Sequence, residues 1–91
     1  KDLRGCHAHY KTEQVLICLS GKVEVVCKDS FRESKFLLES PQQALYVPQM
    51  IWDEQIYRSE DSVLLVLSST SYDPDDYIHD WEKFKRLKED T

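Results

Sequence analysis

Residues 14–27 decide the fold class, and they read Gln14-Val15-Leu16-Ile17-Cys18-Leu19-Ser20-Gly21-Lys22-Val23-Glu24-Val25-Val26-Cys27. An apolar run ends at a serine–glycine pair, and in the run that follows apolar and polar residues alternate. Alternation with a period of two is typical of a half-buried β-strand, and glycine supplies the backbone angles that tight turns need. The stretch therefore predicts two strands joined as a β-hairpin.

Further short apolar runs follow on the C-terminal side of this stretch. We expect strands at 36–38 and 44–47, and a second hairpin over 55–67 with its turn at Ser59-Glu60-Asp61. Short strands at this spacing favour a sandwich or barrel over an alternation of strands and helices. The length fits a single domain over 1–91, with strands from about residue 4 to about residue 70.

The last part of the chain has a helical character. Asp73 is placed to cap a helix whose first residue is Pro74. Apolar side chains then recur at helical spacing, at Tyr77, Trp81, Phe84 and Leu87. These features predict a C-terminal helix over about 74–88 that packs on the outside of an all-β fold.

Charge and composition argue against several classes of protein. The formal net charge of −5 at pH 7 disfavours nucleic-acid binding, which needs a basic face. The longest apolar runs, 15–19 and 63–67, are far too short to span a membrane. The three cysteines have no paired spacing, so they support neither a disulfide framework nor a zinc knuckle, and they fit a reducing cytoplasm.

His7 and His9 are the candidate catalytic residues. They are separated by one residue, so on a strand both side chains point to one face, while Cys6 and Ala8 point to the other. The ordinary pKa of histidine, roughly 6.5, keeps both protonation states accessible near neutral pH. On the concave face of a barrel the pair can bind a metal or transfer protons, and the spacing alone leaves both uses open.

A metal site has partial support. One set of residues is similar to the first metal-binding motif of the cupins, in which two histidines and a glutamate bind iron, manganese or zinc: His7, His9, Glu13 and Gly21. The second cupin motif ends in a further histidine, where this chain has Asp53, and His79 falls in the predicted helix. Proton transfer is therefore the favoured interpretation, and a metal-dependent enzyme is the less favoured one.

Longer blocks of the sequence resemble the WxcM-like cupin family of sugar 3,4-ketoisomerases. The chain opens on Arg-Gly-x-His-Ala-His and closes on Asp-Tyr-Ile-x-Asp, a specific combination, and the matching blocks follow the family order at 4–9, 14–21, 45–48, 51–52, 62–69 and 72–80. The resemblance implies a cupin jelly-roll barrel or sandwich. Relatives carry a further segment before the first block, so we expect upstream sequence to be missing here.

The same resemblance implies an activity. Family members convert a dTDP-linked 4-keto-6-deoxyhexose into its 3-keto isomer, a step toward amino sugars of lipopolysaccharides. It implies no metal and no other cofactor, and a homodimer whose subunits exchange N-terminal strands. The alternative is a non-catalytic cupin that binds a sugar or a nucleotide.

Roles for individual residues also follow from the resemblance. Moving a ketone to the neighbouring carbon needs groups that accept and donate protons near neutral pH. The resemblance implies His9 as the base at C3 and His7 as its partner. Arg4 is a candidate ligand of the pyrophosphate, because a guanidinium binds phosphate through two parallel hydrogen bonds. Gln14 is a candidate hydrogen-bond partner of the sugar or nucleotide, and Trp52 a candidate wall of the hexose pocket.

Overall fold

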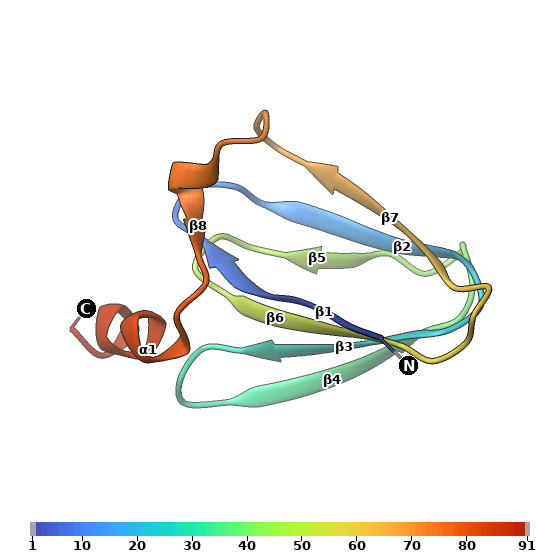
Figure 1. The fold of residues 1–91 in the computed structure, drawn as a ribbon, viewed down its shortest axis with the longest axis horizontal. Coiled ribbons are helices and arrows are strands. Elements are labelled where there is room, and N and C mark those ends of the chain that lie inside the picture. The colour runs from blue at the N-terminus through green and yellow to red at the C-terminus, as the bar shows by residue number, and fades with distance from the viewer. Residues whose placement is uncertain (1, 91) are drawn as a thin grey trace.

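The computed structural model describes residues 2–90 as a sandwich of two antiparallel sheets followed by a short helix (Figure 1). The larger sheet, in the order β4-β3-β6-β1-β8, contains β1 (Asp2–His9), β3 (Val23–Lys28), β4 (Glu33–Leu38), β6 (Trp52–Tyr57) and β8 (Tyr77–Ile78). The smaller sheet, in the order β5-β2-β7, contains β2 (Gln14–Ser20), β5 (Leu45–Val47) and β7 (Val63–Ser68). The helix α1 is Trp81–Glu89. The expected all-β sandwich with a C-terminal helix is confirmed.

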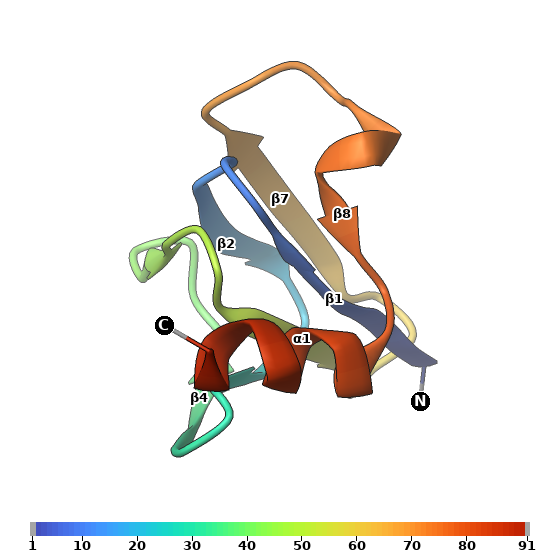
Figure 2. The same cartoon turned by 90° about the vertical axis from the view of Figure 1, so that its left-hand side faces the viewer.

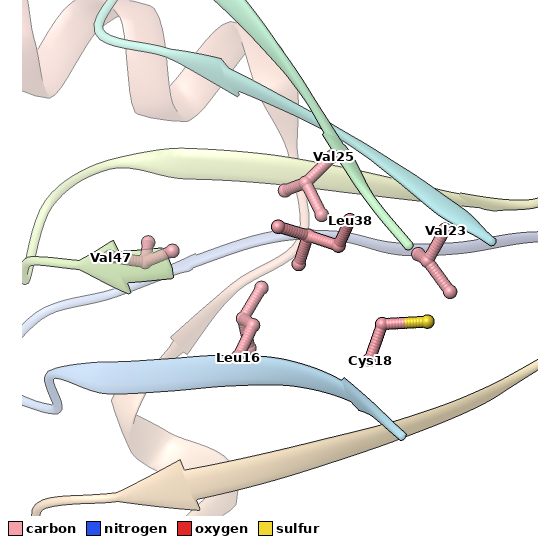
Figure 3. Close-up of a cluster of buried hydrophobic side chains, with 6 residues drawn as sticks. All are labelled: Leu16, Cys18, Val23, Val25, Leu38 and Val47. Atoms are coloured by element: carbon pink, nitrogen blue, oxygen red, sulfur yellow. The ribbon is translucent and has the colours of Figure 1, made fainter. Parts of the chain in front are cut away.

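An apolar cluster fills the space between the two sheets (Figure 3). Its members come from both sheets and are all 4% exposed or less: Leu16, Cys18, Val23, Val25, Leu38 and Val47. On β2 and β3 the buried residues are two positions apart, which follows from the alternation of side chains along a strand. Full burial of such a side chain contributes roughly 1.5–3 kcal/mol, so this cluster holds the sheets together.

Both predicted hairpins are wrong, because the consecutive strands lie in different sheets. β2 pairs with β5 and β7, whereas β3 pairs with β4 and β6, and β6 and β7 are separated in the same way. The apolar residues on either side of Ser20-Gly21 face one another across the sandwich instead of lying side by side. Gly21 has a φ of +72°, and a Cβ there would come within 2.6 Å of Ser62 Oγ, so this crossing is tightly packed.

A second apolar cluster joins α1 to the outer face of the larger sheet. Phe84, which is 0% exposed, packs with Ala8, Trp52 and Ile78. The Trp52 ring centre lies 5.7 Å from that of Phe84 and 5.3 Å from that of Trp81. Figure 2 shows α1 at the end of the sandwich where β1 ends. The predicted packing of the helix on the outside is confirmed. Within residues 2–90, no helix is long and apolar enough to span a membrane.

The helix begins later than predicted. Pro74–Asp76 form one 3-10 turn, capped by Asp73, and Tyr77–Ile78 form β8, which pairs with Ala8 and His9 of β1. α1 starts at Trp81, and its cap is Asp80, whose carboxylate accepts hydrogen bonds from two backbone amides of the first turn. Strand pairing prevails over helical spacing here: Ile78 pairs with Ala8 of β1 and is 2% exposed in the second cluster.

Candidate active site

A β-bulge in β1 determines which side chains point into the sandwich. In the register with β6, Arg4 lies opposite Gln55 and His7 opposite Asp53, and the register shifts between Gly5 and His7. The bulge residues have positive φ, +81° for Gly5 and +57° for the cysteine that follows it. An extra residue of this kind changes the phase of the alternation along a strand.

This change brings an arginine onto the face that carries the histidines. Strict alternation would place Arg4 and His7 on opposite faces of β1. In the structure their partners on β6, Gln55 and Asp53, are both buried on the inner face, at 7% and 1% exposure. The Arg4 guanidinium lies 5.0 Å from the ring centre of Tyr57, which follows on the same face of β6.

His7 and His9 meet near the end of β1, and their predicted position on one face is confirmed. Their ring centres are 4.9 Å apart in an edge-to-face arrangement. Tyr77 of β8 touches both rings, at 5.0 Å from His7 and 4.4 Å from His9. His79, just beyond β8, stacks on Tyr77 and lies 5.9 Å from His7. In the described chain, three imidazoles thus surround one tyrosine.

The ring of His7 is oriented by the bulge. Its Nδ1 lies 3.1 Å from the Gly5 carbonyl oxygen. Because a carbonyl can only accept, Nδ1 carries the proton, and Nε2 of the neutral ring keeps a lone pair. Burial lowers the pKa of His7 to about 4, with a further contribution from His9. The ring is therefore neutral at pH 7 and can accept a proton at Nε2.

His9 lies deeper than His7. It is 5% exposed, and its Nε2 has no hydrogen-bond partner among the described residues. Burial lowers the pKa of His9, and the negative charge of Asp76 opposes this effect. A buried ring nitrogen without a partner is costly unless a ligand or water satisfies it, so His9 is suited to meet a polar group that enters the site.

Asp76 holds β8 and the β1–β2 connection together. Its carboxylate accepts hydrogen bonds from the backbone amides of Lys11 and Thr12, at 2.9 and 3.1 Å, and from the Thr12 hydroxyl at 2.6 Å. Burial raises the pKa of Asp76, but the hydrogen bonds from Thr12 and Lys11 outweigh this effect, so the net shift of the pKa is downward. Asp76 therefore keeps a negative charge near His9.

A small cavity opens beside His9. Its volume is about 110 Å³, and its lining includes Thr12, Ser68, Tyr72 and Tyr77. The ring of Tyr72, which is 78% exposed, lies 5.6 Å from that of Tyr77. Hydroxyl groups and aromatic faces of this kind are suited to a sugar ring.

Arg4 lines a different and larger cavity, of about 430 Å³, together with Tyr57 and Arg58. No histidine lines this cavity, which lies toward the start of β1, whereas His9 lines the smaller one. Arg4 is exposed and forms a 3.4 Å ion pair with Asp2. An exposed ion pair of this kind contributes little to stability, so the guanidinium is available to another anion.

The other two predicted binding residues have different surroundings. Gln14 is buried on the inner side of β2, and its side-chain amide donates to Ser68 Oγ at 3.0 Å. Trp52 is 3% exposed in the apolar cluster under α1, on the face of the sheet opposite His7. The structure thus does not place Trp52 at the histidines, because its position on β6 alternates with that of Asp53.

Glu13 does not join the histidines as the cupin metal motif would require. It is exposed, and its carboxylate accepts a hydrogen bond from the Tyr46 hydroxyl. Across residues 2–90, no three side chains of histidine, cysteine, aspartate or glutamate are arranged to hold a metal ion.

Sequence reasoning missed Asp53 as a buried carboxyl, and it missed Tyr77 and His79. The helical interpretation of 74–88 placed the last two on a helix, away from the pair. One feature of the sequence could have indicated them. The acidic pair Asp75-Asp76 ends a short turn capped by Asp73, and Tyr77 then follows in an extended conformation. The sequence shows Asp53 where the second cupin motif has a histidine. That Asp53 lies opposite His7, however, depends on the bulge in β1.

Comparison with known proteins assigns the family. The family model for FdtA, described as WxcM-like, C-terminal, matches residues 1–89. The chain belongs to this family. It is 43% identical over 83 residues to TDP-4-oxo-6-deoxy-α-D-glucose-3,4-oxoisomerase of Aneurinibacillus thermoaerophilus, a match that covers 91% of the chain and 60% of the relative.

Solved structures of family members have the same fold. The TDP-fucose-3,4-ketoisomerase WlaRA of Campylobacter jejuni superposes with a TM-score of 0.90 at 38% identity, over 96% of this chain and 64% of that one. QdtA, a sugar 3,4-ketoisomerase of Thermoanaerobacterium thermosaccharolyticum in complex with TDP, gives 0.93 at 37% identity, over 98% and 65%. This WxcM-like chain thus spans less than two thirds of the length of these relatives.

Proposed function

We propose that this chain is the catalytic domain of a sugar-nucleotide 3,4-ketoisomerase that acts on a TDP-linked 4-keto-6-deoxyhexose. The observation that carries the proposal is the pair of imidazoles, His7 and His9, 4.9 Å apart on the inner face of β1. The relatives named above support it, and a QdtA variant with asparagine in place of a histidine is known in complex with TDP-4-keto-6-deoxyglucose.

The proposed reaction moves two protons and leaves the atoms of the sugar unchanged in number. A base removes the proton from C3, and the electron pair forms a C3–C4 double bond while the C4 oxygen takes up a proton. The C3 hydroxyl then loses its proton to become the ketone, and C4 receives a proton. Two imidazoles on one face can serve adjacent carbons of one ring.

We assign proton abstraction to His7. The Gly5 carbonyl holds its Nδ1, so Nε2 of the neutral ring has a defined direction and a free lone pair. His9 lines the cavity, and its buried Nε2 has no partner among residues 2–90, so it is suited to move protons between the sugar oxygens and C4. The resemblance alone implied the reverse order, and the hydrogen bond to Gly5 is our reason for the change.

The bulge also supports Arg4 as the ligand of the pyrophosphate. Two residues along a strand span about 7 Å, and the partners of Arg4 and His7 on β6 are two residues apart. A guanidinium at that distance, on the same face, fits a substrate whose sugar lies at the histidines and whose phosphates extend toward Arg4.

The test is conversion of TDP-4-keto-6-deoxyglucose followed by proton NMR. We expect signals of the 3-keto isomer with the wild-type protein and none with His7→Asn. Binding of TDP without any conversion by the wild type would contradict the isomerase proposal and favour the binding-only alternative.

We further propose that a second copy of this chain covers β7. This strand pairs only with β2 in the described structure, and its outward residues are apolar, with Leu67 52% exposed. An apolar edge strand is a template for another chain. The cytoplasmic location expected from the cysteines remains a prediction.

Light scattering on the purified protein tests the dimer. We expect twice the mass of one chain for the wild type and a lower mass for Leu67→Lys. Leu37→Lys on β4, 47% exposed, is the matched control and should leave the mass unchanged. A wild-type protein that is still monomeric at about 100 μM would have a dissociation constant too high for an obligate dimer, and this would contradict the proposal.

A further inference from the structure

The buried carboxyl group of Asp53 has no role in the proton transfers proposed above. Asp53 is 1% exposed on the inner face of β6. Its Oδ1 accepts a hydrogen bond from the Gln55 side-chain amide at 3.1 Å, and its Oδ2 has no hydrogen-bond partner among the described residues. A buried carboxyl oxygen without a partner costs free energy, so its presence calls for an explanation.

Asp53 lies directly across the β1–β6 ladder from His7. Residues that face one another in an antiparallel pair have Cβ atoms only about 4.5–5.5 Å apart. Gly5 touches both side chains. A Cβ at Gly5 would come within 2.9 Å of Asp53 Oδ1, and the Gly5 carbonyl accepts the hydrogen bond from His7. Gly5 of the bulge therefore leaves room for the Asp53 carboxyl and also orients the His7 imidazole.

A negative charge close to His7 would favour proton uptake by its ring. Burial and the charge of His9 lower the pKa of His7 to about 4, whereas proton abstraction is most efficient with a base whose pKa is close to the working pH. The groups that face His7 are His9 on β1, Asp53 on β6, Tyr77 on β8 and His79 beyond it. Of these four, Asp53 is the one that can be negative near neutral pH.

The surroundings of Asp53 leave it ionised at pH 7 and above. Burial raises the pKa of Asp53 to about 6, and the charge of Glu54 adds to this, while the Gln55 amide opposes it. From β3, Cys27 faces Asp53, and burial raises the pKa of that thiol to about 11, so it stays neutral. From β1, Asp53 faces His7 and the bulge at Gly5, which carries no charge.

We propose that Asp53 is a positioning residue that holds a negative charge across the β1–β6 ladder from His7 and makes His7 a stronger base. The proposal rests on the function proposed above, in which His7 abstracts the proton at C3. Asp53 itself does not reach the substrate; it acts through His7.

The test is a pH titration of the His7 imidazole by NMR, with Asp53→Asn as the variant. Asparagine keeps the shape and removes the charge. Where His7 gains its proton, near pH 4, Asp53 with its pKa of about 6 is already neutral, so the midpoint should stay, and the variant should lose the inflection that the His7 signal shows near pH 6 as Asp53 ionises. Glu54→Gln makes the same chemical change one residue away, on the opposite face of β6, and should keep that inflection. An inflection near pH 6 that persists in Asp53→Asn would overturn the proposal.

A second measurement needs no variant. In the wild-type protein, the carboxyl carbon of Asp53 and the ring of His7 should titrate as a coupled pair, so that the His7 signal shows a second inflection where Asp53 ionises. A His7 signal that ignores the ionisation of Asp53 would overturn the proposal even if Asp53→Asn failed to fold.

Activity gives a separate readout. In Asp53→Asn we expect kcat to fall about tenfold with the KM for the sugar nucleotide unchanged, and Asp53→Glu to restore part of kcat. If the wild-type protein shows the coupled titration but no turnover, the isomerase proposal fails while the link between Asp53 and His7 stands. Turnover without the coupling would leave the isomerase and remove Asp53 from its mechanism.

Discussion

The two faces of β1 differ sharply in what they carry. On the inner face lie His7 and His9, and within the described part of the chain a ring nitrogen and a carboxyl oxygen there have no hydrogen-bond partner. On the outer face lies Ala8, 0% exposed beneath Trp52 and Phe84. One face carries polar groups whose hydrogen bonds are incomplete, and the other is closed by apolar side chains.

This difference indicates a division of labour within a single strand. The outer face contributes burial, which stabilises the fold, while the inner face holds polar groups at a cost to stability. Substitutions on the two faces should therefore separate: those on the inner face should change the chemistry, and those on the outer face should change the free energy of unfolding.

The largest effect is expected on the inner face. His7→Asn should lower kcat roughly 10³-fold, because general base catalysis contributes about 10²–10⁴-fold, and it should leave TDP binding unchanged. His9→Asn should have a smaller effect. Steady-state kinetics and calorimetric TDP titrations measure both quantities. If the two variants lost kcat in the reverse order, proton abstraction would belong to His9.

On the outer face, Phe84→Ala should lower the free energy of unfolding by about 4 kcal/mol, because it leaves a cavity among Ala8, Trp52 and Ile78. Urea unfolding followed by tryptophan fluorescence measures this change. The kcat of the folded fraction should stay the same, and Lys85→Ala on the same helix should be close to neutral. A loss of kcat in folded Phe84→Ala would break the separation of the two faces.

Asp53→Asn should change the pH dependence of stability. The pKa of Asp53 is raised from 3.8 to about 6, so below pH 4 both the folded and the unfolded state hold its proton, and its contribution to stability is complete. As the pH rises through 6 that contribution is lost, a difference of about 3 kcal/mol. Relative to the wild type, Asp53→Asn should gain up to that amount between pH 4 and pH 7.5 in urea unfolding. An equal difference at both pH values would contradict this.

The smallest effect is expected at the start of β1. Arg4→Ala should raise the KM for the sugar nucleotide about tenfold with kcat nearly unchanged, since one charge-assisted contact to phosphate is worth about 1.5–3 kcal/mol at most. Arg32→Ala, an exposed arginine on the β3–β4 turn, is the control. An unchanged KM in Arg4→Ala would show that the bulge does not direct Arg4 to the substrate.

Local pattern was sufficient to predict most of the strands, though not β8, and the histidine pair. The alternation around Val23 and Val25 and the spacing of His7 and His9 are properties of a few neighbouring residues, and the structure retains them. The pairing of strands is not local. The Ser20-Gly21 turn looks like a hairpin in sequence, but burial of Leu16 and Val23 against each other sends the two strands to different sheets.

The rest of the candidate site depends on contacts between distant segments. Tyr77 and His79 reach the histidines because Asp76 is bonded to Thr12, a contact across 64 positions that no periodicity reports. The position of Arg4 on the inner face depends on the bulge at Gly5, where the sequence shows only a glycine. Family resemblance supplied the proposed activity, and the hydrogen bond from His7 to Gly5 supplied the reason for choosing His7 as the base.

The most direct test of the account is proton exchange at C3 of TDP-4-keto-6-deoxyglucose in deuterium oxide, followed by NMR of the recovered substrate. We expect the wild-type protein to replace the C3 proton by deuterium, because the abstracted proton is held on an imidazole that exchanges with solvent, and we expect His7→Asn not to do so. A wild-type protein that binds TDP and leaves the C3 proton in place would contradict the claim that the inner face of β1 transfers protons.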